Sequence, residues 1–144
     1  MSKKILVPLD GSPLSEAVLA HAQALAISEG AEIVLLQVPM IPNTELHSRN
    51  PALITNIIKE IEQEAEMYVD TKVSKLISKG AKASGMTRDG SVPDTILAVA
   101  EEIHADVIAM STHGRTGVSR WLMGSVADKI VHHAHIPVML IHPN

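Results

Sequence analysis

Several residue types are absent or rare in this chain of 144 residues: cysteine and phenylalanine do not occur, and tryptophan and tyrosine occur once each. The absence of cysteine excludes disulfides, thiol nucleophiles and thiolate metal sites. The scarcity of aromatic side chains removes the platforms on which nucleic-acid bases stack. The formal charge of −4 also opposes binding to a polyanion. We therefore predict that the protein binds no nucleic acid.

Long hydrophobic runs are missing as well. No stretch approaches the roughly 18 apolar residues that a membrane-spanning helix requires. At the N-terminus, Lys3 and Lys4 are followed by too few apolar residues before Asp10 to form a signal peptide. We therefore expect no membrane insertion and a cytoplasmic location.

Aliphatic residues are what the chain has in abundance, since 46% of it is hydrophobic with almost no aromatic contribution. This composition suits buried parallel strands covered by helices, and the length suits one domain, residues 1–144. Apolar runs predict strands at 3–9, 31–38, 106–110 and 136–142. The segment 81–88, which contains lysine and glycine, is predicted as a weaker strand at a sheet edge. Periodic spacing and capping residues predict helices at 13–28, 51–79, 92–103 and 126–134.

The alternation of strands and helices predicts an α/β fold with one doubly wound parallel five-stranded sheet and helices on both faces. Ligands of such sheets bind beyond the carboxyl ends of the strands, where the winding reverses. If the first and fourth strands are central neighbours, the segment 8–11 and the loop 111–125 lie close together. We therefore expect the functional site between these two segments.

The loop 111–125 joins a predicted strand to a predicted helix and carries glycines at 114, 117 and 124. A strand, a glycine-bearing loop and a helix start form an arrangement that binds phosphates, because backbone N–H groups approach the anion there. Neither the G-x-x-x-x-G-K-[ST] nor the G-x-G-x-x-G pattern is present. Ser125 is predicted at the helix start, as a cap or a phosphate donor. A purely structural loop is the alternative.

Asp10 follows the first strand and is the acidic residue nearest to this expected site. Beside a phosphate-binding loop, a carboxylate suggests an acceptor for ribose hydroxyls or a ligand of a divalent metal. A simple turn cap is the alternative. His113 has no acid, nucleophile or metal partner identifiable beside it, so no catalytic residue is assigned.

Four segments carry a resemblance to a known family: 4–12 (KILVPLDGS), 90–93 (GSVP), 106–114 (DVIAMSTHG) and 137–141 (PVMLI). With them the whole chain resembles the universal stress proteins, which implies the adenine nucleotide alpha hydrolase-like fold and the sheet order 3-2-1-4-5. The ATP-binding branch carries G-x-x-G, nine residues, then Gly and Ser or Thr. Gly114, nine residues and Gly124-Ser125 match its second half, whereas Ser111 stands at the first glycine.

The resemblance also implies site residues and partners. It implies an adenine pocket formed by Pro8, Val38 and Met110, with Asp10 near the ribose or a metal. It implies that Ser111, His113 and Gly114 line the ribose and phosphate side, and that Gly124, Ser125 and Val126 hold the phosphates. The implied ligand is ATP, with Mg or Mn. The implied assembly is a homodimer in which the last strand, 136–142, pairs with its symmetry mate.

Three functions follow from these observations. The leading prediction is an ATP-binding regulatory dimer of the stress response, whose shape or partner affinity depends on bound nucleotide. The alternative is a dimeric interaction protein of the same fold that binds no nucleotide. The third interpretation is an ATPase, whose hydrolysis would be slow because no base or positioned water is identifiable. The question of enzymatic activity is therefore left open.

Overall fold

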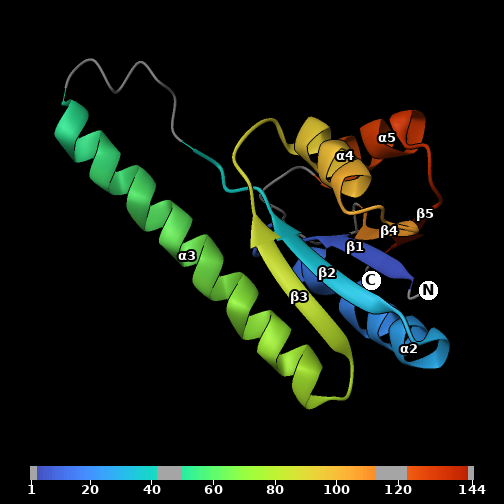
Figure 1. Cartoon of the computed structure of the whole chain (residues 1–144). Helices are drawn as coiled ribbons and strands as arrows, with labels where there is room; N and C mark the ends of the chain where they lie inside the picture. Colours follow the sequence, from blue (N-terminus) through green and yellow to red (C-terminus); the bar gives the residue numbers. More distant parts are fainter. Residues whose placement is uncertain (1–2, 42–49, 113–122, 143–144) are drawn as a thin grey trace.

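The computed structural model describes residues 3–41, 50–112 and 123–142. Five parallel strands form one sheet in the order β3-β2-β1-β4-β5 (Figure 1). The strands are β1 (Lys4–Pro8), β2 (Glu32–Gln37), β3 (Lys82–Thr87), β4 (Val107–Ser111) and β5 (Val138–Ile141). The predicted doubly wound sheet, the implied strand order and the edge position of β3 are all confirmed.

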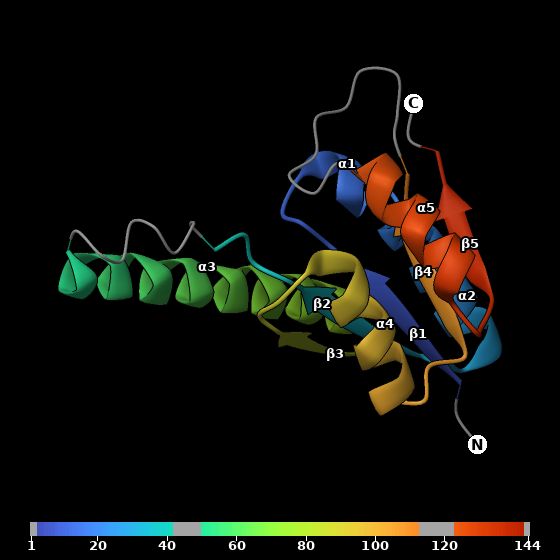
Figure 2. The same cartoon turned by 90° about the horizontal axis from the view of Figure 1, so that it is seen from above.

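Helices cover both faces of this sheet, α2 and α3 on one and α4 and α5 on the other (Figure 2). The helices are α1 (Pro13–Glu16), α2 (Leu19–Glu29), α3 (Pro51–Ser78), α4 (Val92–Glu102) and α5 (Met123–His133). Within the described ranges, none of them is long and apolar enough to cross a membrane.

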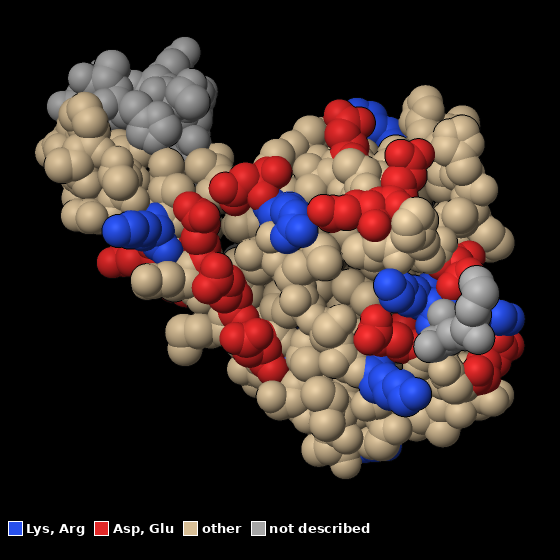
Figure 3. All heavy atoms as spheres, viewed as in Figure 1, with Lys and Arg blue, Asp and Glu red and all other residues tan. Residues whose placement is uncertain are grey.

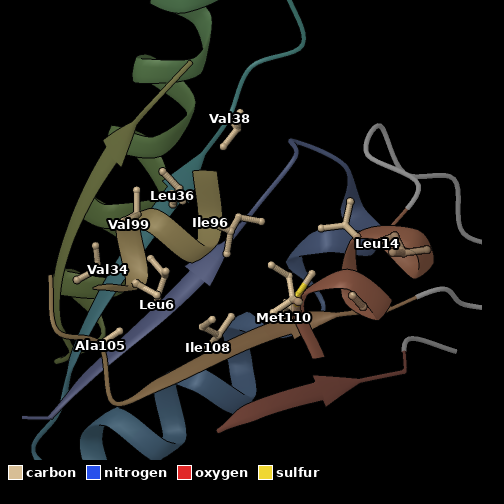
Figure 4. Close-up of a cluster of buried hydrophobic side chains, with 14 residues drawn as sticks. Leu6, Leu14, Val34, Leu36, Val38, Ile96, Val99, Ala105, Ile108 and Met110 are labelled. Atoms are coloured by element: carbon tan, nitrogen blue, oxygen red, sulfur yellow. The ribbon is translucent and has the colours of Figure 1, made fainter. Parts of the chain in front are cut away.

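Two buried clusters fill the spaces between the sheet and its helices. Successive strand residues point to opposite faces, so Leu36 belongs to the α4/α5 cluster and Leu35 to the α2/α3 cluster. Figure 4 shows the α4/α5 cluster, in which Val38 and Met110 lie at the carboxyl ends of their strands. The buried residues of both described clusters are therefore aliphatic, and Tyr68 packs against the α2/α3 cluster as a partly buried neighbour.

The predicted helix 13–28 is interrupted, which corrects the sequence-based expectation. Ser12 caps α1, since its side chain accepts a hydrogen bond from the Ser15 N–H group. One turn later the Ala17 N–H group donates to the Leu14 carbonyl at 3.3 Å, an i to i−3 bond that tightens the turn. The chain then starts again as α2 at Leu19. This break lets α1 lie at the end of the sheet rather than along its face.

The last helix also differs from the prediction. The prediction starts it at Val126, after a loop that extends to Ser125. In the structure α5 already includes Gly124 and Ser125 in its first turn. Ser125 is therefore helical rather than a residue that precedes the helix. Its backbone N–H group belongs to the group of first-turn donors that have no partner within a helix.

The long helix α3 packs on the edge strand β3 at a very short distance. A Cβ atom added to Gly85 would lie 2.2 Å from Val69 Cγ1 and 3.0 Å from Val73 Cγ2. Glycine at this position thus permits the close approach of helix and strand. The 28 residues of α3 span about 42 Å at 1.5 Å per residue. The helix accordingly extends far beyond the sheet (Figure 1).

Candidate functional site

A buried turn follows β1 at the carboxyl edge of the sheet. The Leu9 N–H group still donates to the Leu36 carbonyl at 2.8 Å, so the β1–β2 ladder continues up to this turn. Asp10 is only 1% exposed, and its Oδ1 atom accepts a hydrogen bond from the Ser12 N–H group at 2.8 Å. Gly11 between them has φ of 89°, a left-handed conformation that glycine adopts without strain. The Asp10 carboxylate is therefore held in a fixed position.

Ser15 links this turn to the end of β4. Its Oγ atom accepts a hydrogen bond from the Asp10 N–H group at 3.2 Å and donates one to the Ser12 carbonyl at 2.9 Å. Its own carbonyl accepts a hydrogen bond from Ser111 Oγ at 3.2 Å. Ser15 and Ser111 are both fully buried. The predicted approach of the first and fourth strand ends is thus observed, and the residue that joins them, Ser15, was not predicted.

The predicted adenine-pocket residues lie at the same edge but belong to the core. Pro8 is the last residue of β1 and is buried. Val38 and Met110 are 0% exposed and pack in the α4/α5 cluster (Figure 4). Their side chains serve packing, so a contact between either residue and a base stays a prediction.

The predicted phosphate residues are described only in part. His113 and Gly114 lie outside the described residues. Gly124 and Ser125 are in the first turn of α5, half-buried and exposed respectively, whereas Val126 is 5% exposed and packs in the α4/α5 cluster. The positive end of the helix dipole lies at this turn and favours an anion there.

A hollow of about 370 Å³ opens between the ends of β1 and β2 and helix α3; we call it the β2–α3 hollow. Its lining residues are Asp10, Gly11, Gln37, Val38, Pro39, Met40, Ile61, Glu64, Ala65 and Tyr68. Asp10 and Val38 are predicted site residues. The polar residues Gln37, Glu64 and Tyr68 were not predicted. The one available signal was a glutamine that follows the apolar residues 33–36 of β2.

The electrostatics of this hollow are acidic. Asp10 and Glu64 line it, and its described lining contains no Lys or Arg. Figure 3 shows further acidic side chains in a row along α3. Two carboxylates repel a phosphate group. The hollow therefore suits an uncharged group that carries hydrogen-bond donors.

Next to the hollow, Glu16 connects α1 to α3. Its carboxylate accepts a hydrogen bond from the Tyr68 hydroxyl and forms an ion pair with Lys72 at 3.0 Å. Lys72 Nζ also lies 5.6 Å from the centre of the Tyr68 ring. These three side chains fix the distance between the turn after β1 and the wall of the hollow.

Comparison with known proteins places this architecture in one family. The model of the universal stress protein family matches residues 1–142, and the chain belongs to that family. It is 35% identical over 142 residues to universal stress protein MJ0531 of Methanocaldococcus jannaschii, covering 96% of this chain and 81% of that protein. It is 31% identical to universal stress protein G of Escherichia coli O157:H7, covering 98% and 99%.

Solved structures agree with the sequence comparison. The structure of MJ0577 from Methanocaldococcus jannaschii has a TM-score of 0.80 with this chain at 28% identity, covering 100% of this chain and 98% of that one. A universal stress protein from Archaeoglobus fulgidus in complex with dAMP has a TM-score of 0.62 at 22% identity, covering 98% of both chains. A universal stress protein in complex with cAMP has a TM-score of 0.64 at 20% identity, covering 99% and 98%. The last two likenesses concern the fold.

Proposed function

We propose that this universal stress protein is a regulatory protein that binds ATP at the carboxyl ends of β1 and β4. The observation that carries the proposal is the link between the Asp10 turn and Ser111 through Ser15, which brings both strand ends to one place. The dAMP and cAMP complexes of two relatives of the same fold support an adenine nucleotide as the ligand.

The acidic β2–α3 hollow and the positive end of the α5 dipole determine how we place the nucleotide in the site. The nucleoside part lies toward the acidic β2–α3 hollow, where the Asp10 carboxylate accepts hydrogen bonds from ribose hydroxyls. The triphosphate lies toward the first turn of α5, where Gly124 and Ser125 present backbone N–H groups and the positive end of the helix dipole. His113 and Gly114 complete the phosphate side.

A divalent metal, Mg or Mn, fits Asp10 because a carboxylate oxygen is the kind of donor that these hard cations prefer. The described residues contain no group of three or more His, Asp or Glu side chains that would hold a metal alone. The metal would therefore be held jointly by Asp10 and the phosphates. Bound metal would neutralise charge on the triphosphate.

The regulatory role requires that the nucleotide binds one conformation better than another. We propose that the favoured conformation is recognised by a second copy of the chain, which binds it as a dimer. β5 is an edge strand of the sheet, and its Leu140 is 36% exposed. An exposed edge presents unpaired backbone groups to which another strand can pair. We propose a homodimer through the last strand, 136–142.

The nucleotide proposal is tested by isothermal titration with ATP and MgCl₂. The wild-type chain should bind ATP saturably. Gly124→Val should abolish binding, because the added side chain lies in the first turn of α5, where the backbone N–H groups are proposed to hold the triphosphate. Ala24→Val, which adds the same kind of bulk to an exposed position of α2, is the matched control. Retained ATP binding by a folded Gly124→Val protein would refute the location of the phosphate site.

The dimer is tested by sedimentation velocity. Leu140→Lys should shift the protein toward monomer, because a charge in the strand–strand interface has to be desolvated. Leu53→Lys replaces a leucine that is 53% exposed on α3, far from β5, and should leave the dimer intact. A monomeric wild-type protein at micromolar concentration would exclude this assembly. If dimers form while no nucleotide binds or copurifies, the non-nucleotide interaction protein is the correct reading.

A further inference from the structure

One polar side chain at the candidate site has an unexplained arrangement. Gln37 is 7% exposed, and its Oε1 atom is buried without a hydrogen-bond partner among the described residues. Buried polar atoms almost always have a partner, and each exception in a folded protein calls for an explanation. A ligand that supplies the missing donor is such an explanation.

The position of Gln37 is fixed by the sheet. Its neighbour Leu36 points into the α4/α5 cluster, so the alternation of side chains places Gln37 on the α3 side of β2. Its backbone carbonyl accepts a hydrogen bond from the Arg88 N–H group at 3.2 Å. The backbone carbonyl is therefore satisfied, while the side-chain oxygen is left in the lining of the β2–α3 hollow.

Gln37 also shares the β2–α3 hollow with Asp10. Pro8 pairs with Leu36 in the β1–β2 register, so Gln37 stands opposite Leu9, the residue that precedes Asp10. Neighbouring strands are about 4.8 Å apart. The hollow is therefore lined by the unpartnered Gln37 oxygen and, on the neighbouring strand end, by the Asp10 carboxylate, and a ligand that fills it must bring a donor for Gln37.

We propose that Gln37 is the specificity-determining residue of the nucleotide site, with Oε1 accepting a hydrogen bond from the exocyclic amino group of the base. This inference rests on the proposed binding of an adenine nucleotide. Adenine carries an amino group at C6, where hypoxanthine carries an oxo group. A base with the oxo group would place an acceptor against an acceptor, and sites built to hydrogen-bond one ligand group discriminate strongly against such analogues.

The ribose hydroxyls are the other donors of the ligand, and we assign them to Asp10. The two assignments lead to different outcomes. Loss of the amino group, as in inosine triphosphate, should expose the role of Gln37. Loss of the 2′-hydroxyl, as in 2′-deoxy-ATP, should be insensitive to the side chain at position 37.

The experiment compares the dissociation constants of ATP, inosine triphosphate and 2′-deoxy-ATP, with MgCl₂, for the wild-type chain and Gln37→Met. Methionine has a similar length and no strong hydrogen-bonding atom. The wild-type chain should prefer ATP over inosine triphosphate by at least about tenfold. The variant should lose most of that preference and keep the wild-type ratio for 2′-deoxy-ATP.

Controls separate specificity from folding. Gln63→Met makes the same exchange at an exposed position of α3 and should behave as wild type. Gln37→Leu should repeat the Gln37→Met result if one variant folds poorly. Without nucleotide, Gln37→Met should unfold at a higher temperature than wild type, because it removes an unsatisfied buried acceptor.

Three outcomes would overturn the inference. An unchanged preference for ATP in Gln37→Met would reject it while leaving ATP binding in place. A changed ratio for 2′-deoxy-ATP alone would assign Gln37 to the ribose instead of the base. A wild-type chain that binds no ATP would reject the proposed function, and this inference with it.

Discussion

The contact between Gly85 and α3 makes a quantitative test of the packing. In Gly85→Ala the new Cβ atom lies 2.2 Å from Val69 Cγ1, whereas carbon atoms in ordinary contact are about 3.5–4.0 Å apart. Val69 is 2% exposed, and a valine in a helix has one strongly preferred rotamer. The collision therefore cannot be relieved by rotating the side chain, and α3 must move away from β3 by roughly 1 Å or more.

The expected loss of stability follows from two opposing terms. Overpacking of this kind costs about 1–3 kcal/mol, and the clash at Gly85 belongs at the upper end because the neighbouring side chain is buried and branched. Replacing glycine by alanine inside a strand regains about 0.5–1 kcal/mol. We expect Gly85→Ala to lower the free energy of unfolding by about 2 kcal/mol, measured by urea denaturation with far-ultraviolet circular dichroism.

A double mutant identifies the cause of this loss. Val69→Ala alone should cost about 2 kcal/mol, because it removes two buried methyl groups. In the combined variant the methyl group added at position 85 occupies part of the space that the valine side chain leaves. The two losses should therefore not add, and the double mutant should be about 2 kcal/mol more stable than their sum predicts. Additive losses, or a Gly85→Ala loss below about 0.5 kcal/mol, would contradict the steric explanation.

Three further predictions concern the hydrogen bonds and ion pairs of the described residues. Ser15→Ala removes the hydroxyl that contacts Asp10 and Ser12; it should lower the free energy of unfolding in urea by about 2–3 kcal/mol and weaken ATP binding in titrations, and a neutral effect on both would contradict the role of Ser15. Tyr68→Phe should cost about 1 kcal/mol by losing the bond to Glu16, an effect that should vanish when Glu16→Ala is already present. The hydrogen bond and charge of Glu29 raise the pKa of Lys3 above its ordinary value of 10.5, so this pair contributes below pH 10.5 and its contribution is lost as the pH rises further. Because Lys3 is exposed, the difference in thermal midpoint between wild type and Lys3→Gln should be small at neutral pH in low salt, and it should disappear in strong salt or well above the pKa of Lys3; a difference that persists there would have another origin.

The strands β1, β2, β4 and β5 were predictable because each is a short, mostly aliphatic run between turn residues, whereas β3 (KASGMT) carries only a weak strand pattern. Because these runs alternate with segments of helical periodicity, few folds other than a parallel sheet covered by helices were compatible with the sequence. Ser12 before Pro13 gave the correct start of α1, and Asn50 before Pro51 is the corresponding cap of α3. Local chemistry alone determines features of this kind.

The features that escaped prediction depend on distant contacts. The interruption after α1 involves Ser15, whose carbonyl is bonded by Ser111, 96 residues away; the local sequence 13–28 has no residue that ends a helix. Gln37 was not singled out because a glutamine at the end of a strand gives no local sign of burial, whereas the structure buries it in the lining of the β2–α3 hollow. Gly85 looked like a weakness of an edge strand, whereas the helix that packs on it requires a residue without a side chain.

The central position of β1 has a consequence for biosynthesis. β1 pairs with β2 on one side and with β4, which begins at Val107, on the other, so most of the chain is synthesised before β1 gains its second neighbour. A nascent chain that ends before Val107 carries an unpaired, largely apolar strand edge, the type of surface on which chains aggregate. Truncated products should therefore need chaperones, and ligand-induced stabilisation should appear only once the C-terminal third has left the ribosome.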